Sequence, residues 1–267
     1  MDNRPIGIFD SGLGGLTVVK EVMKQLTNES IVYFGDTARV PYGNKSKATV
    51  TKFSAQIIRF LLSKDVKAII IACNTVNSNC AIELRELFPE LMIEGVVGPG
   101  VIMASRATKN GRIGVIGTEG TVKSGRYAER LREIHPEYQI FSKACPLFVP
   151  LVEDGWTNTE VAKMVIATYL NELLEEDIDT LILGCTHYPI LSEDIQAVVG
   201  KHIKLINPAN ETAYQMGLHL LQENIQAIAI PSYHFYVSDH KEQMQDMAKM
   251  FLGCKTPDVI EVDIEKY

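Results

Sequence analysis

The chain has 267 residues, of which 46% are apolar, enough for one large domain or two small ones with a substantial core. Its net charge of −7 argues against a nucleic-acid partner, because phosphate binding needs a basic surface. The sequence has no apolar run long enough for a membrane span and no apolar signal segment after Met1–Pro5. We therefore expect a cytoplasmic protein without a membrane partner.

Strand-like and helix-like runs alternate from the first residues onward. Short aliphatic runs predict buried strands, and apolar residues spaced three or four apart predict helices. In chain order these runs are Ile6–Phe9, Leu16–Leu26, Ile31–Phe34, Thr49–Leu62, Ala68–Ala72, Val76–Phe88 and Leu91–Val97. We expect Asn74 or Thr75 to cap the helix that begins at Val76. This alternation predicts a mostly parallel α/β sheet that is covered on both faces.

The pattern begins again after the turn at Gly98–Gly100. Arg112–Thr118 resembles Pro5–Ser11 at an offset of 107 positions, and the stretch around Cys185 resembles that around Cys73 at an offset of 112. We therefore expect two α/β lobes of the same architecture, the first from residues 1–97 plus 208–267 and the second from residues 98–207. The remaining predicted elements are Thr180–Leu183, Ile203–Ile206, Glu211–Gln222, His234–Val237, Lys241–Phe251 and Val259–Ile264.

Two of the five cysteines stand at functional positions. Cys73 and Cys185 each follow a buried strand, at the sheet edge where open α/β proteins bind ligands. A helix N-terminus stabilises a thiolate and lowers the pKa of a cysteine, so we expect both thiols to act as acid–base groups. The alternative for any free cysteine is a small buried apolar side chain, which we expect for Cys80, Cys145 and Cys254. An odd number of cysteines without a C-x-x-C pair argues against a disulfide framework or a zinc cluster.

The segment Asp10–Gly15 is a glycine-rich turn that opens a helix. It is not a dinucleotide motif, because that motif needs a glycine at Thr17, and the chain has no Walker lysine. The free N–H groups of such a turn can hold a carboxylate. Asp10 is then available to bind an ammonium or to assist a base, and the alternative is that it only caps the helix. The loop Gly35–Gly43, taken alone, is more typical of an ordinary turn.

His187 lies two residues after Cys185, where a histidine can tune the protonation of the thiol. The alternative is a structural histidine that binds a backbone carbonyl. Glu153 could orient His187 if its loop approaches the histidine in the fold.

Four motifs together resemble the glutamate racemases, in order and spacing, over almost the whole chain. They are Phe9–Thr17, Gly35–Gly43, Ala72–Thr75 and Gly184–Pro189. The resemblance implies two flavodoxin-like α/β lobes, related by a pseudo-twofold axis, with the active site in the cleft between them. It also implies cofactor-independent interconversion of L- and D-glutamate, without a metal, supplying D-glutamate for peptidoglycan. Homodimers are usual among such proteins, so the resemblance implies a homodimer.

The same resemblance implies roles for single residues. Cys73 would be the base that acts on D-glutamate and Cys185 the base that acts on L-glutamate, with Asp10 and His187 assisting. The residues implied to line the substrate pocket are Asp10, Ser11, Tyr42, Gly43, Asn74, Thr75, Thr186 and His187. The chain departs from the family at Val76–Asn79, where small residues are usual. Other functions remain open: an aspartate racemase, or a carboxylate-binding protein with inert cysteines. A thiol redox protein is disfavoured by the absence of C-x-x-C.

Overall fold

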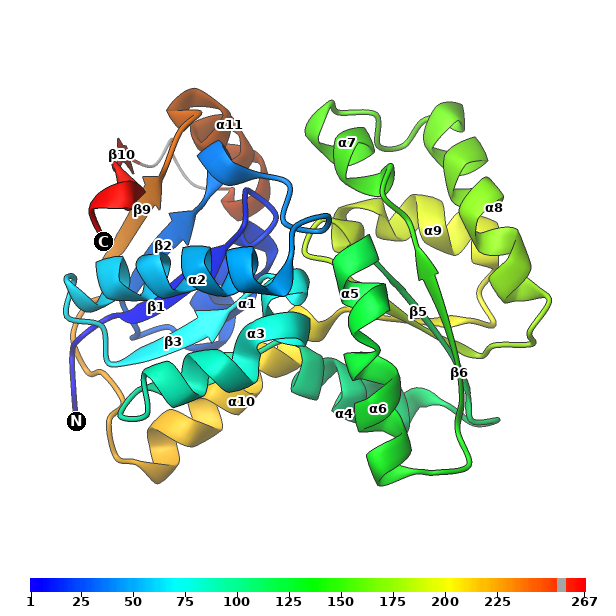
Figure 1. Cartoon of the computed structure of the whole chain (residues 1–267), viewed down its shortest axis with the longest axis horizontal. Helices are drawn as coiled ribbons and strands as arrows, with labels where there is room; N and C mark the ends of the chain where they lie inside the picture. Colours follow the sequence, from blue (N-terminus) through cyan, green and yellow to red (C-terminus); the bar gives the residue numbers. More distant parts are fainter. Residues whose placement is uncertain (254–257) are drawn as a thin grey trace.

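The computed structural model describes residues 1–253 and 258–267, and these form two α/β lobes side by side (Figure 1). The first sheet has the strand order β10-β9-β2-β1-β3-β4 and the second has the order β6-β5-β7-β8. All strand pairings in these two sheets are parallel. The predicted fold class, two α/β lobes with mostly parallel sheets, is therefore confirmed.

The first sheet takes its strands from both ends of the described chain, and the second takes them from the middle. The strands of the first sheet are β1 (Ile6–Asp10), β2 (Ile31–Gly35), β3 (Ala68–Ile71), β4 (Met92–Gly95), β9 (Tyr233–Val237) and β10 (Val259–Glu261). The strands of the second sheet are β5 (Arg112–Gly117), β6 (Gln139–Ala144), β7 (Thr180–Gly184) and β8 (Lys204–Ile206). The assignment of residues 98–207 to a separate domain stays a prediction.

Helices cover both faces of each sheet. On the first sheet, α2 (Lys47–Leu62) and α3 (Asn74–Leu87) lie on one face, and α1 (Leu16–Gln25), α10 (Pro208–Gln222) and α11 (Lys241–Leu252) lie on the other. On the second sheet, α4 (Val97–Ala107) and α6 (Arg126–Ile134) lie opposite α7 (Phe148–Glu153), α8 (Glu160–Leu174) and α9 (Ser192–Val199). The short helix α5 (Glu119–Ser124) packs against α3 at the junction of the lobes. Within the described residues, no helix is long and apolar enough to cross a membrane.

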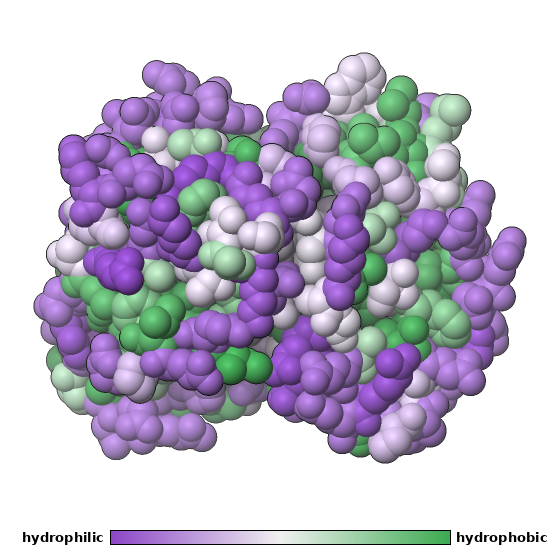
Figure 2. Space-filling model, in the orientation of Figure 1, coloured by the Kyte–Doolittle hydropathy of each residue, from purple (hydrophilic) through white to green (hydrophobic). Residues whose placement is uncertain are grey.

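The two lobes share one strand order. In each lobe the first strand lies between the second and the third, and the fourth lies beyond the third. The two orders are β2-β1-β3-β4 and β6-β5-β7-β8. One continuous apolar core reaches from α1 and α10 of the first lobe to α8 and α9 of the second. The surface shows a waist between the lobes (Figure 2). The carboxyl ends of the two third strands, β3 and β7, carry the cysteines singled out in the sequence.

Several predicted element boundaries are wrong. Helix α3 begins at Asn74, with Cys73 at its N-cap position, so neither Asn74 nor Thr75 caps the helix. Their side chains bond to the second lobe instead. The turn predicted at Gly98–Gly100 lies inside α4, because β4 already ends at Gly95. Pro99 is tolerated there, since the N–H groups of a first helical turn have no partner within the helix.

Helix α10 begins at Pro208, three residues before the predicted start. The side chain of Asn207 accepts a hydrogen bond from the Ala209 N–H at 3.1 Å and so caps the helix. Proline at the first helical position fits, because its fixed φ suits the helix and its missing N–H is not needed.

Candidate active site

Cys73 and Cys185 lie in the wall of one cavity between the lobes. The cavity has a volume of about 410 Å³ and takes its walls from both lobes. Cys73 comes two residues after β3, and Cys185 follows β7 directly. Their side chains are only 4% and 6% exposed. The geometry therefore brings two thiols, one from each lobe, to a single small-molecule site.

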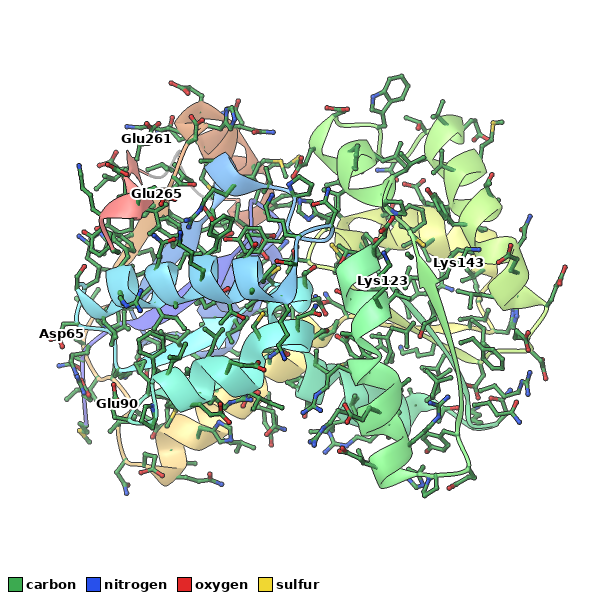
Figure 3. The ribbon with its side chains drawn as sticks, viewed as in Figure 1. Asp65, Glu90, Lys123, Lys143, Glu261 and Glu265 are labelled. Atoms are coloured by element: carbon green, nitrogen blue, oxygen red, sulfur yellow. The ribbon has the colours of Figure 1, made fainter. Side chains whose placement is uncertain are left out.

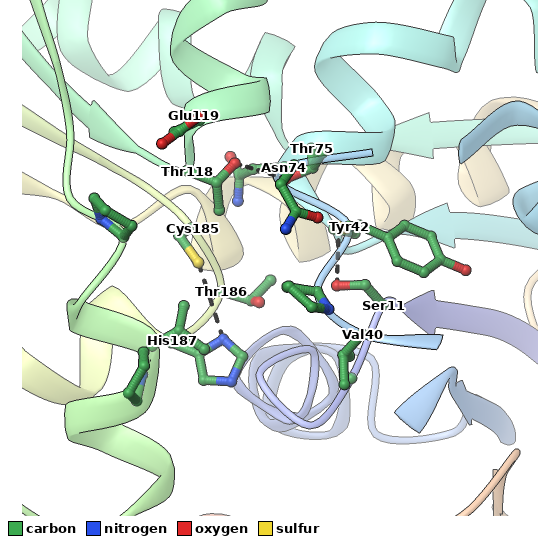
Figure 4. Close-up of a pocket in the computed structure, with 18 of the residues that line it drawn as sticks. Ser11, Val40, Tyr42, Asn74, Thr75, Thr118, Glu119, Cys185, Thr186 and His187 are labelled. Atoms are coloured by element: carbon green, nitrogen blue, oxygen red, sulfur yellow. Dashed lines mark hydrogen bonds between the residues drawn. The ribbon is translucent and has the colours of Figure 1, made fainter. Parts of the chain in front are cut away.

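Most of the predicted pocket residues line this cavity. Its polar wall consists of Ser11, Tyr42, Gly43, Asn44, Cys73, Asn74, Thr75, Thr118, Glu119, Glu153, Cys185, Thr186 and His187. Its apolar wall includes Val40, Pro41, Pro146, Val149 and Pro150. Figure 4 shows Cys185 and His187 on one side, with Ser11 and Asn74 across from them. The roles predicted for these residues stay predictions, and what the structure adds is their common location.

Cys185 is linked through His187 to Glu153. Its Sγ lies 3.9 Å from Nδ1 of His187, and Nε2 of His187 lies 3.0 Å from Oε1 of Glu153 (Figure 4 shows the first contact). Burial of the imidazole opposes its protonation, but the contacts with Cys185 and Glu153 outweigh burial and raise the pKa of His187 to about 10. The approach of Glu153 to His187, which the sequence left open, is present. At neutral pH the histidine beside Cys185 is therefore an imidazolium.

Cys73 has a different environment. Its Sγ lies 3.4 Å from Oγ of Ser11, and the N–H of Val76 in the first turn of α3 also supports it. Burial nevertheless raises the pKa of Cys73 to about 12, and the nearby carboxylate of Asp10 acts in the same direction. We expected the helix N-terminus to lower this pKa, and for Cys73 that expectation is wrong. The free-energy cost of removing the thiolate from water is larger than the stabilisation that one hydroxyl and the first helical turn provide.

Asp10 lies behind the wall of the cavity rather than in it, and is fully buried. Its Oδ2 accepts the N–H groups of Gly12 and Gly15 at 3.2 and 3.1 Å, so it holds the turn that opens α1. Its Oδ1 accepts from the Thr186 hydroxyl at 3.4 Å. Burial raises the pKa of Asp10, although His187 and these backbone N–H groups oppose the rise. Asp10 therefore braces the turn before α1, whose N-cap Gly15 has no side-chain cap, and it also links this turn to the second lobe.

The loop with Tyr42 and Gly43 is held from behind by a charged network that the sequence did not reveal. The hydroxyl of Tyr42 donates to Asp36, a fully buried carboxylate. Arg39 donates from Nε to both oxygens of Asp36, at 3.0 and 2.8 Å, and from Nη1 to Glu265 at 2.9 Å. Figure 3 shows Glu265 at the outer edge of the first lobe. The last turn of the chain therefore supports one wall of the cavity.

Three residues at or beside the cavity were not predicted from the sequence: Thr118, Glu119 and Tyr127. Thr118 follows the first strand of the second sheet as Ser11 follows the first strand of the first sheet, and the offset of 107 positions pairs these two residues. The internal repeat therefore carried a signal for Thr118. Glu119 lines the cavity beside it. Tyr127 gave no signal, because only the fold brings its hydroxyl to the site.

Cys80 and Cys145 do not line the cavity. Cys80 and Cys145 are fully buried, as predicted, and Cys254 lies outside the described residues. Across residues 1–253 and 258–267, no cluster of three or more His, Cys, Asp or Glu side chains is arranged to hold a metal ion.

Fold and site define a class: two-lobed α/β enzymes whose reaction centre lies in the cleft between the lobes. Residues 6–216 match the family model of the Asp/Glu/Hydantoin racemases. The glutamate racemase of Geobacter metallireducens is 46% identical, over 98% of this chain and 97% of the relative. That of Thermoanaerobacter pseudethanolicus is 42% identical over 100% of both chains. The crystal structure of glutamate racemase from Francisella tularensis in complex with D-glutamate superposes with a TM-score of 0.93, at 38% identity and 100% coverage of both chains. The chain therefore belongs to the Asp/Glu/Hydantoin racemase family, and it is an isomerase.

Proposed function

We propose that this protein interconverts L- and D-glutamate without a cofactor, using Cys73 and Cys185 as the two acid–base groups. The observation that carries the proposal is the placement of these thiols, one from each lobe, in the wall of one cavity. Inversion at a carbon requires that a proton leave one face and another arrive at the opposite face, so it needs two groups on two sides. Glutamate is supported by the relatives, which are named glutamate racemases, and by D-glutamate in one solved structure.

In the forward direction the Cys185 thiolate removes the α-proton of L-glutamate and the Cys73 thiol donates a proton to the other face. In the reverse direction Cys73 is the base that acts on D-glutamate, and Cys185 is the acid. The raised pKa of Cys73 keeps it a thiol at neutral pH, which is the state that the forward direction requires. The imidazolium of His187 places a positive charge 3.9 Å from the sulfur of Cys185. Asp10 assists through the turn and through Thr186.

The α-proton of an amino acid is only weakly acidic, so the site must also stabilise negative charge that develops on the substrate. Donors fixed in advance around the α-carboxylate do this best, because they need no rearrangement during the reaction. The donors that the cavity offers are the hydroxyls of Ser11 and Thr75, the amide of Asn74 and the backbone at Tyr42–Gly43. The two lobes cover the cavity from both sides, which limits water and strengthens these interactions.

Three further statements belong to the same proposal. D-Glutamate made by this enzyme supplies peptidoglycan synthesis, the enzyme works in the cytoplasm, and it acts as a homodimer. All three rest on the resemblance to the glutamate racemases, and the near-complete coverage of both relatives supports their transfer to this chain.

The test is circular dichroism of L-glutamate and, separately, of L-aspartate solutions incubated with purified protein and no added cofactor. We expect the signal of glutamate to decay to zero and that of aspartate to persist. In deuterium oxide, deuterium should enter the α-position during turnover. Cys73→Ala and Cys185→Ala should each abolish racemisation.

Full racemase activity in either cysteine variant would contradict the two-thiol mechanism. Faster decay of the aspartate signal would identify an aspartate racemase. If neither signal decays although glutamate protects the thiols from alkylation, the protein binds the carboxylate without turning it over.

A further inference from the structure

Tyr127 reaches the site from the second lobe. It lies on α6, its side chain is 2% exposed, and its hydroxyl donates to Oδ1 of Asn74 at 2.7 Å. Asn74 is the first residue of α3 in the first lobe and lines the cavity. The bond therefore crosses the cleft and ends on a residue that faces the substrate.

The ring of Tyr127 has little freedom to move. A Cβ added to Gly184, the residue before Cys185, would lie 3.4 Å from the ring, and one added to Gly100 on α4 would lie 3.1 Å from it. The two glycines thus leave room for an aromatic ring and hold it between α4 and the end of β7. Burial raises the pKa of Tyr127, so its hydroxyl keeps its proton and can act as a donor.

The hydrogen-bond network decides which end of the Asn74 amide faces the cavity. In the described part of the chain, the proton of the Tyr127 hydroxyl has one acceptor, Oδ1 of Asn74. A flipped amide would leave this buried proton without an acceptor, which is costly. No protein oxygen among the described residues accepts from Nδ2 of Asn74. The NH₂ group is therefore available to a ligand.

We infer that Tyr127 is a positioning residue, which holds the Asn74 amide so that its NH₂ group donates to a carboxylate of the substrate. An NH₂ group cannot accept a hydrogen bond, so Asn74 in this orientation binds a carboxylate and not the α-ammonium. Because Tyr127 and Asn74 belong to different lobes, the donor is fixed only when the lobes are together. The inference rests on the proposed function. It adds Tyr127 as a residue that acts on the substrate indirectly, through Asn74.

The first test is Tyr127→Phe, which keeps the ring and removes the hydroxyl. Once the amide is free to turn, we expect the KM for glutamate and the Kd for D-glutamate from calorimetry to rise about tenfold, and kcat to change by less than about threefold. Tyr138→Phe, at a half-buried tyrosine of the same lobe that does not line the cavity, is the matched control and should leave both constants unchanged. In an Asn74→Ala background the effect of Tyr127→Phe should disappear, whereas a merely structural role would persist.

The second test does not depend on the folding of a Tyr127 variant. If NH₂ faces a carboxylate, Asn74→Asp sets charge against charge and should weaken glutamate binding more than Asn74→Ala does. If the amide oxygen instead faces the ammonium, Asn74→Asp should bind as well as wild type or better, and the inference is overturned. Unchanged constants in Tyr127→Phe would overturn it too. A wild-type protein that binds D-glutamate but does not racemise it would refute the proposed function alone, since the Kd comparisons would still stand.

Discussion

The thiols of Cys73 and Cys185 have different local environments, although they occupy matching positions in the two lobes. Cys185 is paired with a protonated histidine, which is in turn paired with Glu153. Cys73 is supported by the hydroxyl and the backbone N–H of Ser11 and by the first turn of α3, but burial and the negative charge of Asp10 both disfavour its thiolate. The chain thus places one thiol beside an imidazolium and the other beside a buried carboxylate, where burial keeps it protonated. This asymmetry suits a reaction that needs one base and one acid at the same moment.

The pair of His187 and Glu153 gives a prediction for the pH dependence of stability. The pKa of His187 is raised from 6.5 in the unfolded chain to about 10. Folding therefore favours the protonated form, and the stabilisation is complete below pH 6.5 and is lost as the pH rises through about 10. In Glu153→Gln the imidazolium loses its carboxylate, so the free energy of unfolding should fall less steeply over this range.

Urea unfolding at pH 6.5, 8 and 9.5 measures this difference. The gap between wild type and Glu153→Gln should be largest at pH 6.5 and should shrink toward pH 9.5. The titration of Cys73 is common to both proteins and cancels in the comparison. Glu160→Gln, at an exposed glutamate of the same lobe, is the control and should give a gap that does not change with pH. A constant gap for Glu153→Gln would contradict the pairing.

At the residue scale, the sequence predicts what is local and misses what the fold assembles. A buried strand followed by a cysteine and polar residues is visible in the chain, so Cys73 and Cys185 could be found. The hydroxyl of Tyr127 and the carboxylate of Asp36 come to the site only through tertiary packing. The sign of the pKa shift at Cys73 was mispredicted because it depends on the depth of burial, which the helix N-terminus alone does not set.

At the scale of elements, the turn before α1 sets the geometry of the second lobe's histidine. A Cβ at Gly14 would lie 2.4 Å from Oγ1 of Thr186 and 2.5 Å from Nδ1 of His187. Real Cβ atoms do not approach other atoms so closely, so a glycine is required where the two lobes touch. The sequence indicated a carboxylate-binding turn there, but the close approach to Thr186 and His187 depends on the packing of two lobes that no local pattern describes.

Gly14→Ala should therefore displace His187 and lower kcat for glutamate racemisation by about a hundredfold or more, because small misplacements of catalytic groups are costly. Gly98→Ala is the matched control, since a Cβ at Gly98 would meet nothing within 4 Å. In the helix α4 the alanine should leave activity unchanged and stabilise the protein by about 0.5–1 kcal/mol. Steady-state kinetics and thermal unfolding of both variants check this. Wild-type kcat in Gly14→Ala would show that the turn and His187 can separate without consequence.

At the scale of the whole molecule, α3 is the element that fastens the lobes beside the cavity. The hydroxyls of Thr75 and Thr118 lie 2.8 Å apart across the junction. Nδ2 of Asn79 donates to the carbonyl oxygen of Thr75 at 2.8 Å and to that of Gly120 in α5 at 3.1 Å. A Cβ at Gly120 would lie 3.0 Å from the carbonyl oxygen of Gly43, so the backbones of the two lobes are in close contact here.

Asn79→Asp tests the contact between the lobes at Asn79, because it replaces one NH₂ group with an oxygen. The carboxylate cannot donate, and it would face two carbonyl oxygens, so the junction should loosen at a cost of about 1–3 kcal/mol in the free energy of unfolding. Because Thr75 and Thr118 line the cavity, the KM for glutamate should rise, and X-ray scattering should give a larger radius of gyration. Asn28→Asp makes the same charge change at an exposed asparagine away from the junction and should alter neither quantity. If Asn79→Asp keeps the KM and the radius of gyration of wild type, the remaining contacts hold the lobes together and Asn79 is dispensable.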